Sequence, residues 1–333
     1  MRCAWSWAIR RPAQSSRMTV DVVTAGGCTV DIVYTADGAT RGPQLGGNAI
    51  YAAAGARVWG LRAGVIAFRG TGLPEGWAEV LTALDIDTSG LIPVDVPASV
   101  TEFFYDAEGE RTQRVWAPAH DGQAVPYLPA DTGEPIRRLR LSAQHVPDGY
   151  LRAHGAHLAP MHGEAQRALA TVFAPLGVLT LDPYPHVMAE TSDDGLAILL
   201  APVAVFMPSQ EEVRARFPDR TLGEALDRLS SLARLATVIK QGRQGALIHD
   251  RALGRRHVVP SVPVIAKDPT GAGDAFCGGV LAGLIAGREA LQAVACGAVS
   301  ASFAVEDFGL GGLRRASAPE RDRRLRWVLE RAQ

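Results

Sequence analysis

Residues 268–276, DPTGAGDAF, set a glycine turn and two carboxylates directly before an apolar run of helical spacing at residues 277–284. We therefore expect the turn at a helix N-terminus, where unpaired backbone N–H groups and the helix dipole favour a phosphate. Gly271 and Gly273 lack a Cβ, so their backbone can approach an anion closely. Asp274 would lie beside that anion, where its carboxylate can accept a proton from an alcohol. The pattern predicts an anion hole with a base inside it, whereas a bare G-x-G-D would more simply indicate a turn with an Asp cap.

The size and charge of the chain limit the class of protein. It has 333 residues, of which 47% are hydrophobic, enough to bury a large core. This length favours one large α/β domain with a small appendage. The formal net charge is −1, so there is no basic excess of the kind that binds nucleic acid or anionic lipid. No run of about 18 apolar residues is present, and we expect no membrane span.

The cysteines and the chain ends predict a cytoplasmic protein. Residues 1–18 lack the apolar core and the cleavage site of a secretory signal. We interpret them as a disordered extension and leave open whether Met1 or Met18 is the functional start. Residues 316–333 are basic and are expected to form a solvated helix. Four cysteines lack metal-ligand spacing and indicate neither a zinc site nor a disulfide framework, which fits a reducing cytoplasm: Cys3, Cys28, Cys277 and Cys296.

Strand and helix patterns alternate along most of the chain. The first part of the chain has the pattern of a strand at residues 19–25, an Ala-rich helix at 49–56 and a strand at 58–67. This order predicts that the two strands pair in parallel through a right-handed crossover. Further strands are expected at residues 157–160, 177–182, 203–207, 237–240 and 246–248. Ligands of such sheets bind outside the carboxyl ends of the strands. The polar or glycine residues expected at that edge are Asp31, Gly46, Gly47, Asp182, Glu212, Gly242 and Asp274.

Residues 268–276 closely resemble the C-terminal signature of the ribokinase-like (PfkB) carbohydrate kinase family, D-T-x-G-A-G-D-x-F. Thr270 and the residues that follow it fit, while Pro269 stands where the family usually has Thr. The resemblance extends over residues 19–315. It implies a ribokinase-like fold, in which helices flank a doubly wound, mostly parallel sheet that carries a small β-sheet lid.

A hairpin pattern at residues 100–116 interrupts the alternation of strands and helices. The resemblance implies that this hairpin belongs to the lid over the sugar site, with contributions from about residues 32–44 and 94–117. A surface hairpin without a role in function is the alternative. The lid also offers a surface through which relatives form homodimers, although a monomer remains equally open.

The acceptor side of the site is implied by two motifs. Gly46, Gly47 and Asn48 resemble the start of the family signature G-G-x-x-x-N-x-A, whose glycines let the backbone meet sugar hydroxyls. The match is partial, because Tyr51 occupies the position of the signature Asn. Tyr51 could stack on a sugar or base ring or pack into the core. The resemblance also implies that Asp31 binds two substrate hydroxyls, and a carboxylate with two acceptor oxygens suits a vicinal diol.

The nucleotide side is implied by shorter motifs. Residues 207–212, MPSQEE, resemble a P-N-x-x-E element whose glutamate orients magnesium-bound water, which assigns Glu212 to Mg²⁺. Ser209 replaces the Asn of that element, and a capping box of Ser209 and Glu212 explains the spacing as well. Residues 238–246 resemble the segment that passes under the nucleotide. The nucleotide-binding candidates are Lys240, Gly242, Gly245 and Thr270.

The predicted reaction is transfer of the γ-phosphoryl group of ATP to a hydroxyl of a sugar or sugar derivative. Asp274 would act as base, and the Gly271, Ala272 and Gly273 amides would stabilise the moving charge. ATP and Mg²⁺ are the expected cofactors, and in many relatives the position of Asp268 supports a monovalent cation such as K⁺. A nucleoside kinase of the same family and a catalytically weak sugar-binding sensor are the alternatives.

Overall fold

The computed structural model describes residues 20–35, 38–105, 111–118, 124–126 and 139–332, without the side chains of residues 111, 115–118 and 124–126. The extension expected at residues 1–18 lies outside these ranges. So do parts of the two segments assigned to the lid, at residues 36–37 and 106–110.

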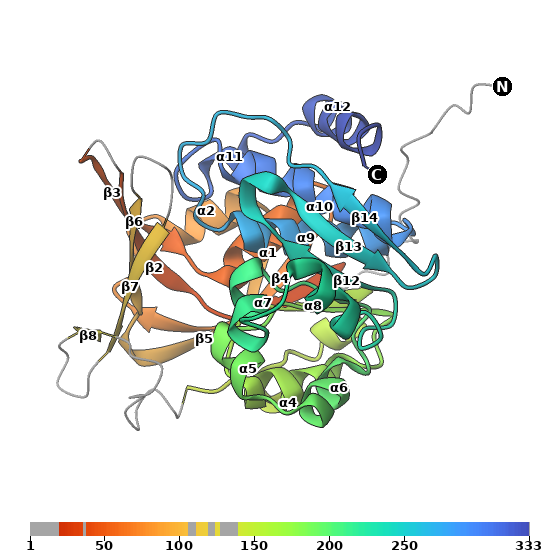
Figure 1. Ribbon diagram of the computed structural model, residues 1–333. Helices are drawn as coiled ribbons and strands as arrows, with labels where there is room; N and C mark the ends of the chain where they lie inside the picture. The colour runs from red at the N-terminus through yellow and green to blue at the C-terminus, as the bar shows by residue number, and fades with distance from the viewer. Residues whose placement is uncertain (1–19, 36–37, 106–110, 119–123, 127–138, 333) are drawn as a thin grey trace.

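A nine-stranded sheet forms the body of the molecule (Figure 1). Every neighbouring pair from β12 to β5 is parallel, while β13 is antiparallel to both of its neighbours, β12 and β14. The order across the sheet is β14 (Arg255–Val259), β13 (Ala246–Asp250), β12 (Ala236–Lys240), β11 (Val205–Phe206), β10 (Val178–Leu181), β9 (Gly155–Leu158), β1 (Val22–Ala25), β4 (Ala63–Thr71) and β5 (Ile86–Pro97). This mostly parallel sheet confirms the predicted fold class.

The strand expected at residues 58–67 starts later than predicted. Val58 and Trp59 donate backbone hydrogen bonds to Ala54 and Ala56 and so finish the preceding helix. Gly60 then turns the chain, and β4 begins only at Ala63. Apolar residues in the last helical turn extended the strand pattern, because a short apolar run does not by itself separate helix from strand.

Helices cover both faces of the large sheet, and a separate apolar cluster lies under each layer (Figure 1). One layer contains α1 (Asn48–Arg57), α2 (Trp77–Ala83), α9 (Ala272–Ile285), α10 (Ala290–Ala304), α11 (Gly311–Arg314) and α12 (Ala318–Leu329). The other contains α4 (Gly163–Phe173), α5 (Pro185–Glu190), α6 (Asp193–Leu200), α7 (Gln210–Arg216) and α8 (Leu222–Leu229). Single 3₁₀ turns are η1 (Ala143–His145), η2 (Tyr150–Arg152) and η3 (Gly242–Gln244). The helix expected at residues 316–333 is α12, which buries Leu325 and Val328 rather than being solvated all round.

Helices α1 and α9 cross at very short range, which sets the position of the candidate site. A Cβ added to Gly278 of α9 would collide with the backbone carbonyl of Ala52, and one on Gly55 of α1 would collide with that of Ala275. Glycine at these two positions therefore lets the helix backbones touch. Because Asp274 lies in the first turn of α9 and Tyr51 lies on α1, this crossing holds the two sides of the site together.

A second, five-stranded sheet lies at one end of the large sheet (Figure 1). Its order is β3 (Thr40–Gly46), β2 (Thr29–Tyr34), β6 (Val100–Tyr105), β7 (Arg111–Pro118) and β8 (Ala124–Pro126). All neighbours are antiparallel except β2 and β6. The hairpin predicted at residues 100–116 is the β6–β7 pair, and β2 carries Asp31.

Candidate active site

The glycine turn begins a helix, as its sequence predicts. Gly271 is the N-cap of α9 and has a φ of 74°, a left-handed conformation that favours glycine. The N–H groups of the first helical turn have no partner within the helix and point away from its body. Ala272 differs from the prediction, because its N–H already donates to the Pro269 carbonyl at 3.2 Å. The amide of Gly273, the next in this turn, is therefore better suited to an anion than that of Ala272.

Tyr51 lies beneath this turn. A Cβ on Gly271 would collide with the Tyr51 ring, whose side chain is 1% exposed. Burial raises the pKa of its hydroxyl well above the ordinary value, and the charges of Asp31, Asp268 and Asp274 add to this shift. The acceptor-side aspartate and the predicted base therefore lie around one buried ring. Of the two roles open for Tyr51, the structure favours packing, in this case under the anion hole.

The loop before the turn is held from two sides. The Asp268 carboxylate is buried and accepts hydrogen bonds from the Thr270 amide at 2.9 Å and the Gly309 amide at 3.5 Å. Burial raises the pKa of Asp268 in spite of these donors. From the small sheet, the Tyr105 hydroxyl lies 2.8 Å from the Thr270 hydroxyl. Strand β6 is thus attached directly to the loop that leads into the anion hole.

Asp31 and the glycine pair meet as predicted. Asp31 is buried in β2, and its carboxylate accepts a hydrogen bond from the Thr29 hydroxyl at 2.8 Å. Gly46, at the end of β3, packs so closely that a Cβ there would collide with the Asp31 carboxylate. Gly47 caps α1 with a φ of 111°. These residues form one corner, where β2, β3 and α1 meet.

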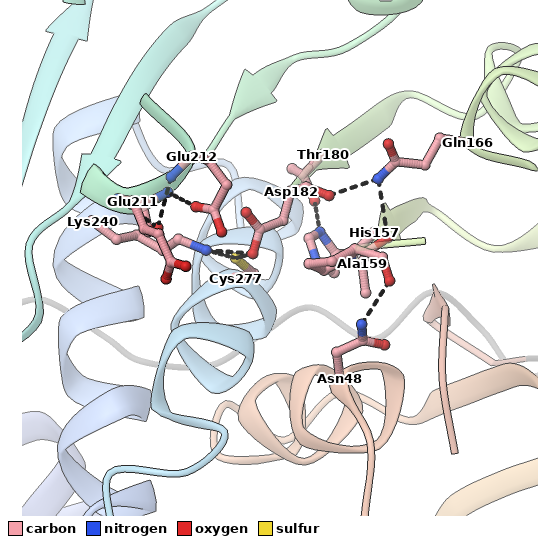
Figure 2. Close-up of polar contacts among 12 residues, drawn as sticks. Asn48, His157, Ala159, Gln166, Thr180, Asp182, Glu211, Glu212, Lys240 and Cys277 are labelled. Carbon is pink, nitrogen blue, oxygen red and sulfur yellow. Dashed lines mark hydrogen bonds and ion pairs between the residues drawn. The ribbon is translucent and has the colours of Figure 1, made fainter. Parts of the chain in front are cut away.

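Asn48 differs from the substrate contact predicted for it. Its amide oxygen accepts a hydrogen bond from the Gly27 amide at 2.7 Å, and its amide nitrogen donates to the Pro160 carbonyl at 2.7 Å. Both ends of the side-chain amide therefore bind main chain, at the ends of neighbouring strands β1 and β9. Figure 2 shows this side chain beneath β9. We assign Asn48 a role in joining these strand ends.

Lys240 reaches the same edge of the sheet from the end of β12. Its ammonium is paired with the Asp182 carboxylate and lies 3.8 Å from the Cys277 sulfur (Figure 2). Burial alone would lower the pKa of Lys240, but the neighbours Asp182, Cys277 and Glu212 outweigh it and raise the pKa. A Cβ on Gly273 would lie 3.8 Å from the Lys240 nitrogen. The ammonium is therefore adjacent to the anion hole.

Glu212 lies in α7, and its carboxylate caps the helix. It accepts a hydrogen bond from the Ser209 amide, while the Ser209 hydroxyl accepts from the amides of Glu211 at 3.2 Å and Glu212 at 3.5 Å. The capping box foreseen for this segment is therefore present. The segment also touches β12, since the Lys240 amide donates to the Pro208 carbonyl at 2.9 Å.

The two glycines predicted under the nucleotide bound a short turn. Gly242 begins η3 with a φ of 56°, and a Cβ there would meet open space. Gly245 ends η3, and a Cβ there would collide with the Val259 carbonyl. Gly245 is thus explained by strand packing, while Gly242 remains a candidate for approach to the nucleotide.

Asp182 was expected at this edge of the sheet but was given no role by the motifs, and Gln166 was not predicted as a site residue. Asp182 follows β10 directly, and the Gln166 amide nitrogen donates to the carbonyls of Ala159 at 3.1 Å and Asp182 at 2.6 Å. Figure 2 shows these groups around His157, whose Nδ1 lies 3.0 Å from the Thr180 hydroxyl. An Asp directly after an apolar strand was the available signal. Its partner Lys240 could not be identified from the sequence, because they are 58 residues apart.

His157 should make the protein sensitive to acid. Burial, together with the Lys240 charge, lowers the pKa of His157 from 6.5 to about 3. Below pH 6.5 the unfolded chain gains a proton at this residue that the folded protein does not, so stability falls progressively from there to about pH 3. At about pH 4 the loss is on the order of 3 kcal/mol.

His157→Gln cannot take up this proton in either state. The decrease in Tm between about pH 7 and pH 4 should therefore be smaller in the variant than in the wild type. His154→Gln, at an exposed position, is the matched control. An equal decrease in the wild type and in His157→Gln would contradict the assignment.

In the described ranges, no three His, Cys, Asp or Glu side chains converge as a metal site. No helix in the described part of the chain is long and apolar enough to cross a membrane.

Residues 21–315 match the model of the pfkB family carbohydrate kinases. The chain therefore belongs to this family and is an alcohol phosphotransferase.

Individual relatives agree with this classification. Cytidine kinase from Thermococcus kodakarensis is 26% identical over 292 residues, covering 87% of this chain and 98% of that protein. Nucleoside kinase from Burkholderia thailandensis, solved with inosine, has a TM-score of 0.71 at 17% identity, covering 93% of this chain and 98% of the other. An E. coli protein provisionally named ribokinase II, solved with ATP and Mg²⁺, has a TM-score of 0.69 at 23% identity and covers 92% and 99%.

Proposed function

We propose that this kinase transfers the γ-phosphoryl group of ATP to a hydroxyl of a sugar or nucleoside, with Asp274 as the general base. The observation that carries the proposal is the position of Asp274 in the first turn of α9, directly after the left-handed Gly271. This places a carboxylate next to backbone amides that favour a phosphate.

In the proposed step, the acceptor oxygen attacks the γ-phosphorus and forms a new O–P bond. The bond from that phosphorus to the β–γ bridging oxygen breaks, and its electron pair stays on ADP. The acceptor proton passes to the Asp274 carboxylate. The amides of the α9 N-terminus stabilise the charge on the moving phosphoryl group, with Gly271 shaping the turn and Ala272 bonded within it.

The nucleotide would lie against Thr270, Gly242, Gly245 and Lys240, on the β12 side of the anion hole. The complex of the E. coli relative with ATP and Mg²⁺ supports this pair of ligands. Glu212 is partly buried beside Lys240, and its charge acts on the lysine, so an acidic group is available for the water shell of Mg²⁺. Bound Mg²⁺ would neutralise the triphosphate. We propose K⁺ beside Asp268 as well, because its buried carboxylate, which accepts hydrogen bonds from the Thr270 and Gly309 amides, brings a negative charge to this loop.

The acceptor would bind at the corner formed by Asp31, Gly46 and Gly47, and the small sheet would act as its lid. Asp31 can accept hydrogen bonds from two adjacent hydroxyls. The Tyr105–Thr270 hydrogen bond supports the lid assignment, because it joins β6 to the loop before the anion hole. A homodimer through this sheet and a reducing cytoplasm complete the proposal. The buried free thiols of Cys28, Cys277 and Cys296 fit such a compartment.

Asp31→Ala should raise KM for the acceptor by about tenfold to a hundredfold, since hydrogen bonds to a charged group contribute about 1.5–3 kcal/mol each. KM for ATP should change by less than about threefold. Asp31→Asn keeps the size and one acceptor oxygen and should have a smaller effect. Steady-state kinetics with either substrate varied test this, and equal changes in both KM values would remove Asp31 from the acceptor site.

The acceptor itself can be identified by ADP release from MgATP. The panel contains pentoses, hexoses, sugar acids and nucleosides. Cytidine and inosine are included because one relative is a cytidine kinase and another was solved with inosine. Each is assayed with and without K⁺, and Asp274→Asn serves as the blank. A substrate-dependent signal that the blank lacks supports the kinase. Silence across the panel, with a thermal shift from one compound, would favour the sensor.

A further inference from the structure

We propose that Lys240 supplies positive charge to the transferred phosphoryl group and that Asp182 is the carboxylate that positions it. This inference rests on the proposed function, and it assigns a role to a buried ion pair that the general-base mechanism leaves unused.

The ion pair is almost closed to solvent. The Lys240 side chain is 12% exposed and the Asp182 side chain 3%. Removing two charges from water costs free energy that their attraction often fails to recover, and a well-packed apolar pair is frequently as stable. Stability alone therefore does not explain a charged pair at this position. Its place beside the anion hole does, because the positive charge of Lys240 can act on a phosphate bound there.

The hydrogen bonds of Lys240 leave it a donor for a ligand. An ammonium has three N–H groups. One is given to Asp182, and the Cys277 sulfur lies 3.8 Å away as a weaker acceptor. Cys277 in turn lies 3.7 Å from the same Asp182 oxygen, which fixes the pair against α9. The remaining N–H is available on the side of Gly273, where a Cβ would lie 3.8 Å from the nitrogen.

Several titratable groups surround this ion pair. Asp182 after β10, Glu212 on α7 and Cys277 on α9 act on the Lys240 charge, Asp274 on α9 acts on Asp182, and His157 on β9 is affected by Lys240. A phosphate that arrives at the α9 N-terminus adds negative charge to this acidic group. The Lys240 charge offsets it, and the benefit grows as charge develops on the moving phosphoryl group in a site shielded from water. Lys240 transfers no proton in this step and acts as a hydrogen-bond donor and a charge.

Asp182 acts through Lys240 and is a positioning residue. Its second carboxylate oxygen is buried and has no hydrogen-bond partner within the described part of the chain. Its main-chain carbonyl is held by Gln166 at 2.6 Å, so the carboxylate is presented from a fixed strand end. The same carboxylate keeps the lysine protonated, because a buried ammonium without a counter-charge loses its proton easily.

The test compares Lys240→Met, Asp182→Asn and the double variant with the wild type, using MgATP and the acceptor with the highest rate in the panel. Lys240→Met should lower kcat by about a hundredfold or more, as expected for loss of one preorganised donor, and change the acceptor KM by less than about threefold. Asp182→Asn should lose kcat as pH rises, because burial then lowers the pKa of the unpaired Lys240, and should regain it at lower pH. Asp227→Asn, in the exposed ion pair with Arg256, is the matched control.

The double variant separates a structural role from an electrostatic one. It removes both charges, so it should fold even if Lys240→Met is destabilised by an uncompensated buried carboxylate. We expect its kcat to stay as low as that of Lys240→Met, with MgATP still raising Tm. Three results would each overturn the proposal. They are recovery of turnover in the double variant, a kcat of Lys240→Met within about threefold of wild type, and a wild-type pH profile for Asp182→Asn. A wild type that phosphorylates no acceptor would instead refute the proposed function, before any variant is compared.

Discussion

Asp274→Asn should lower kcat by about a hundredfold or more and leave MgATP binding largely intact. The substitution keeps the size of the side chain and its place in the first turn of α9. An amide cannot accept the acceptor proton, whereas the glycine turn and the helix N-terminus that bind phosphate remain. Steady-state kinetics measure kcat, and the rise in Tm on adding MgATP measures nucleotide binding.

Asp194→Asn is the control for this experiment. Asp194 also lies in the first turn of a helix, α6, but it is exposed and belongs to the helix layer on the opposite face of the sheet from α9 (Figure 1). Its replacement should leave kcat unchanged. An Asp274→Asn enzyme with wild-type kcat would show that this carboxylate is not the base, and loss of the MgATP thermal shift would indicate damage to the anion hole instead.

Gly278→Ala should destabilise the protein by about 3 kcal/mol or more, the upper range for overpacking, because the added methyl meets backbone rather than a movable side chain. The Cβ would collide with the Ala52 carbonyl of α1. Helix α9 can relieve this only by moving away from α1, and it carries Asp274 with it. We therefore expect a lower Tm together with a lower kcat.

The matched control is Gly163→Ala in the first turn of α4. A Cβ there makes only ordinary contacts, 3.7 Å from Arg167 and from Val187. Replacing glycine by alanine in a helix with enough space is neutral or stabilising. If Gly278→Ala tolerates heating as well as Gly163→Ala does, the close crossing of α1 and α9 is not what positions the site.

The sequence predicted those parts of the molecule that local patterns determine. Alternating strands and helices indicated the parallel sheet, and the glycines at residues 271 and 273 indicated a helix N-terminus that the structure confirms. The spacing of Ser209 and Glu212 predicted a capping box, which is present. Each of these features depends on residues close together in the chain, where periodicity and turn chemistry carry the information.

Features that depend on the packing of distant segments could not be predicted from the sequence. Nothing local to Lys240 shows that its partner is Asp182, since the pairing follows from the order of β10, β11 and β12 in the sheet. Asn48 was expected to contact substrate, yet its amide joins the ends of β1 and β9. Tyr51 replaces the Asn of the family signature, and only the crossing of α1 and α9 places its ring under Gly271.

Transfer of label from [γ-³²P]ATP tests the central claim most directly. Wild-type enzyme is incubated with labelled MgATP and the acceptor identified by ADP release, and the products are separated from inorganic phosphate. We predict that the label appears in the phosphorylated acceptor and that Asp274→Asn forms this product at about a hundredth of the rate or less. Label that appears only in inorganic phosphate, or no ATP turnover with any acceptor, would contradict the account.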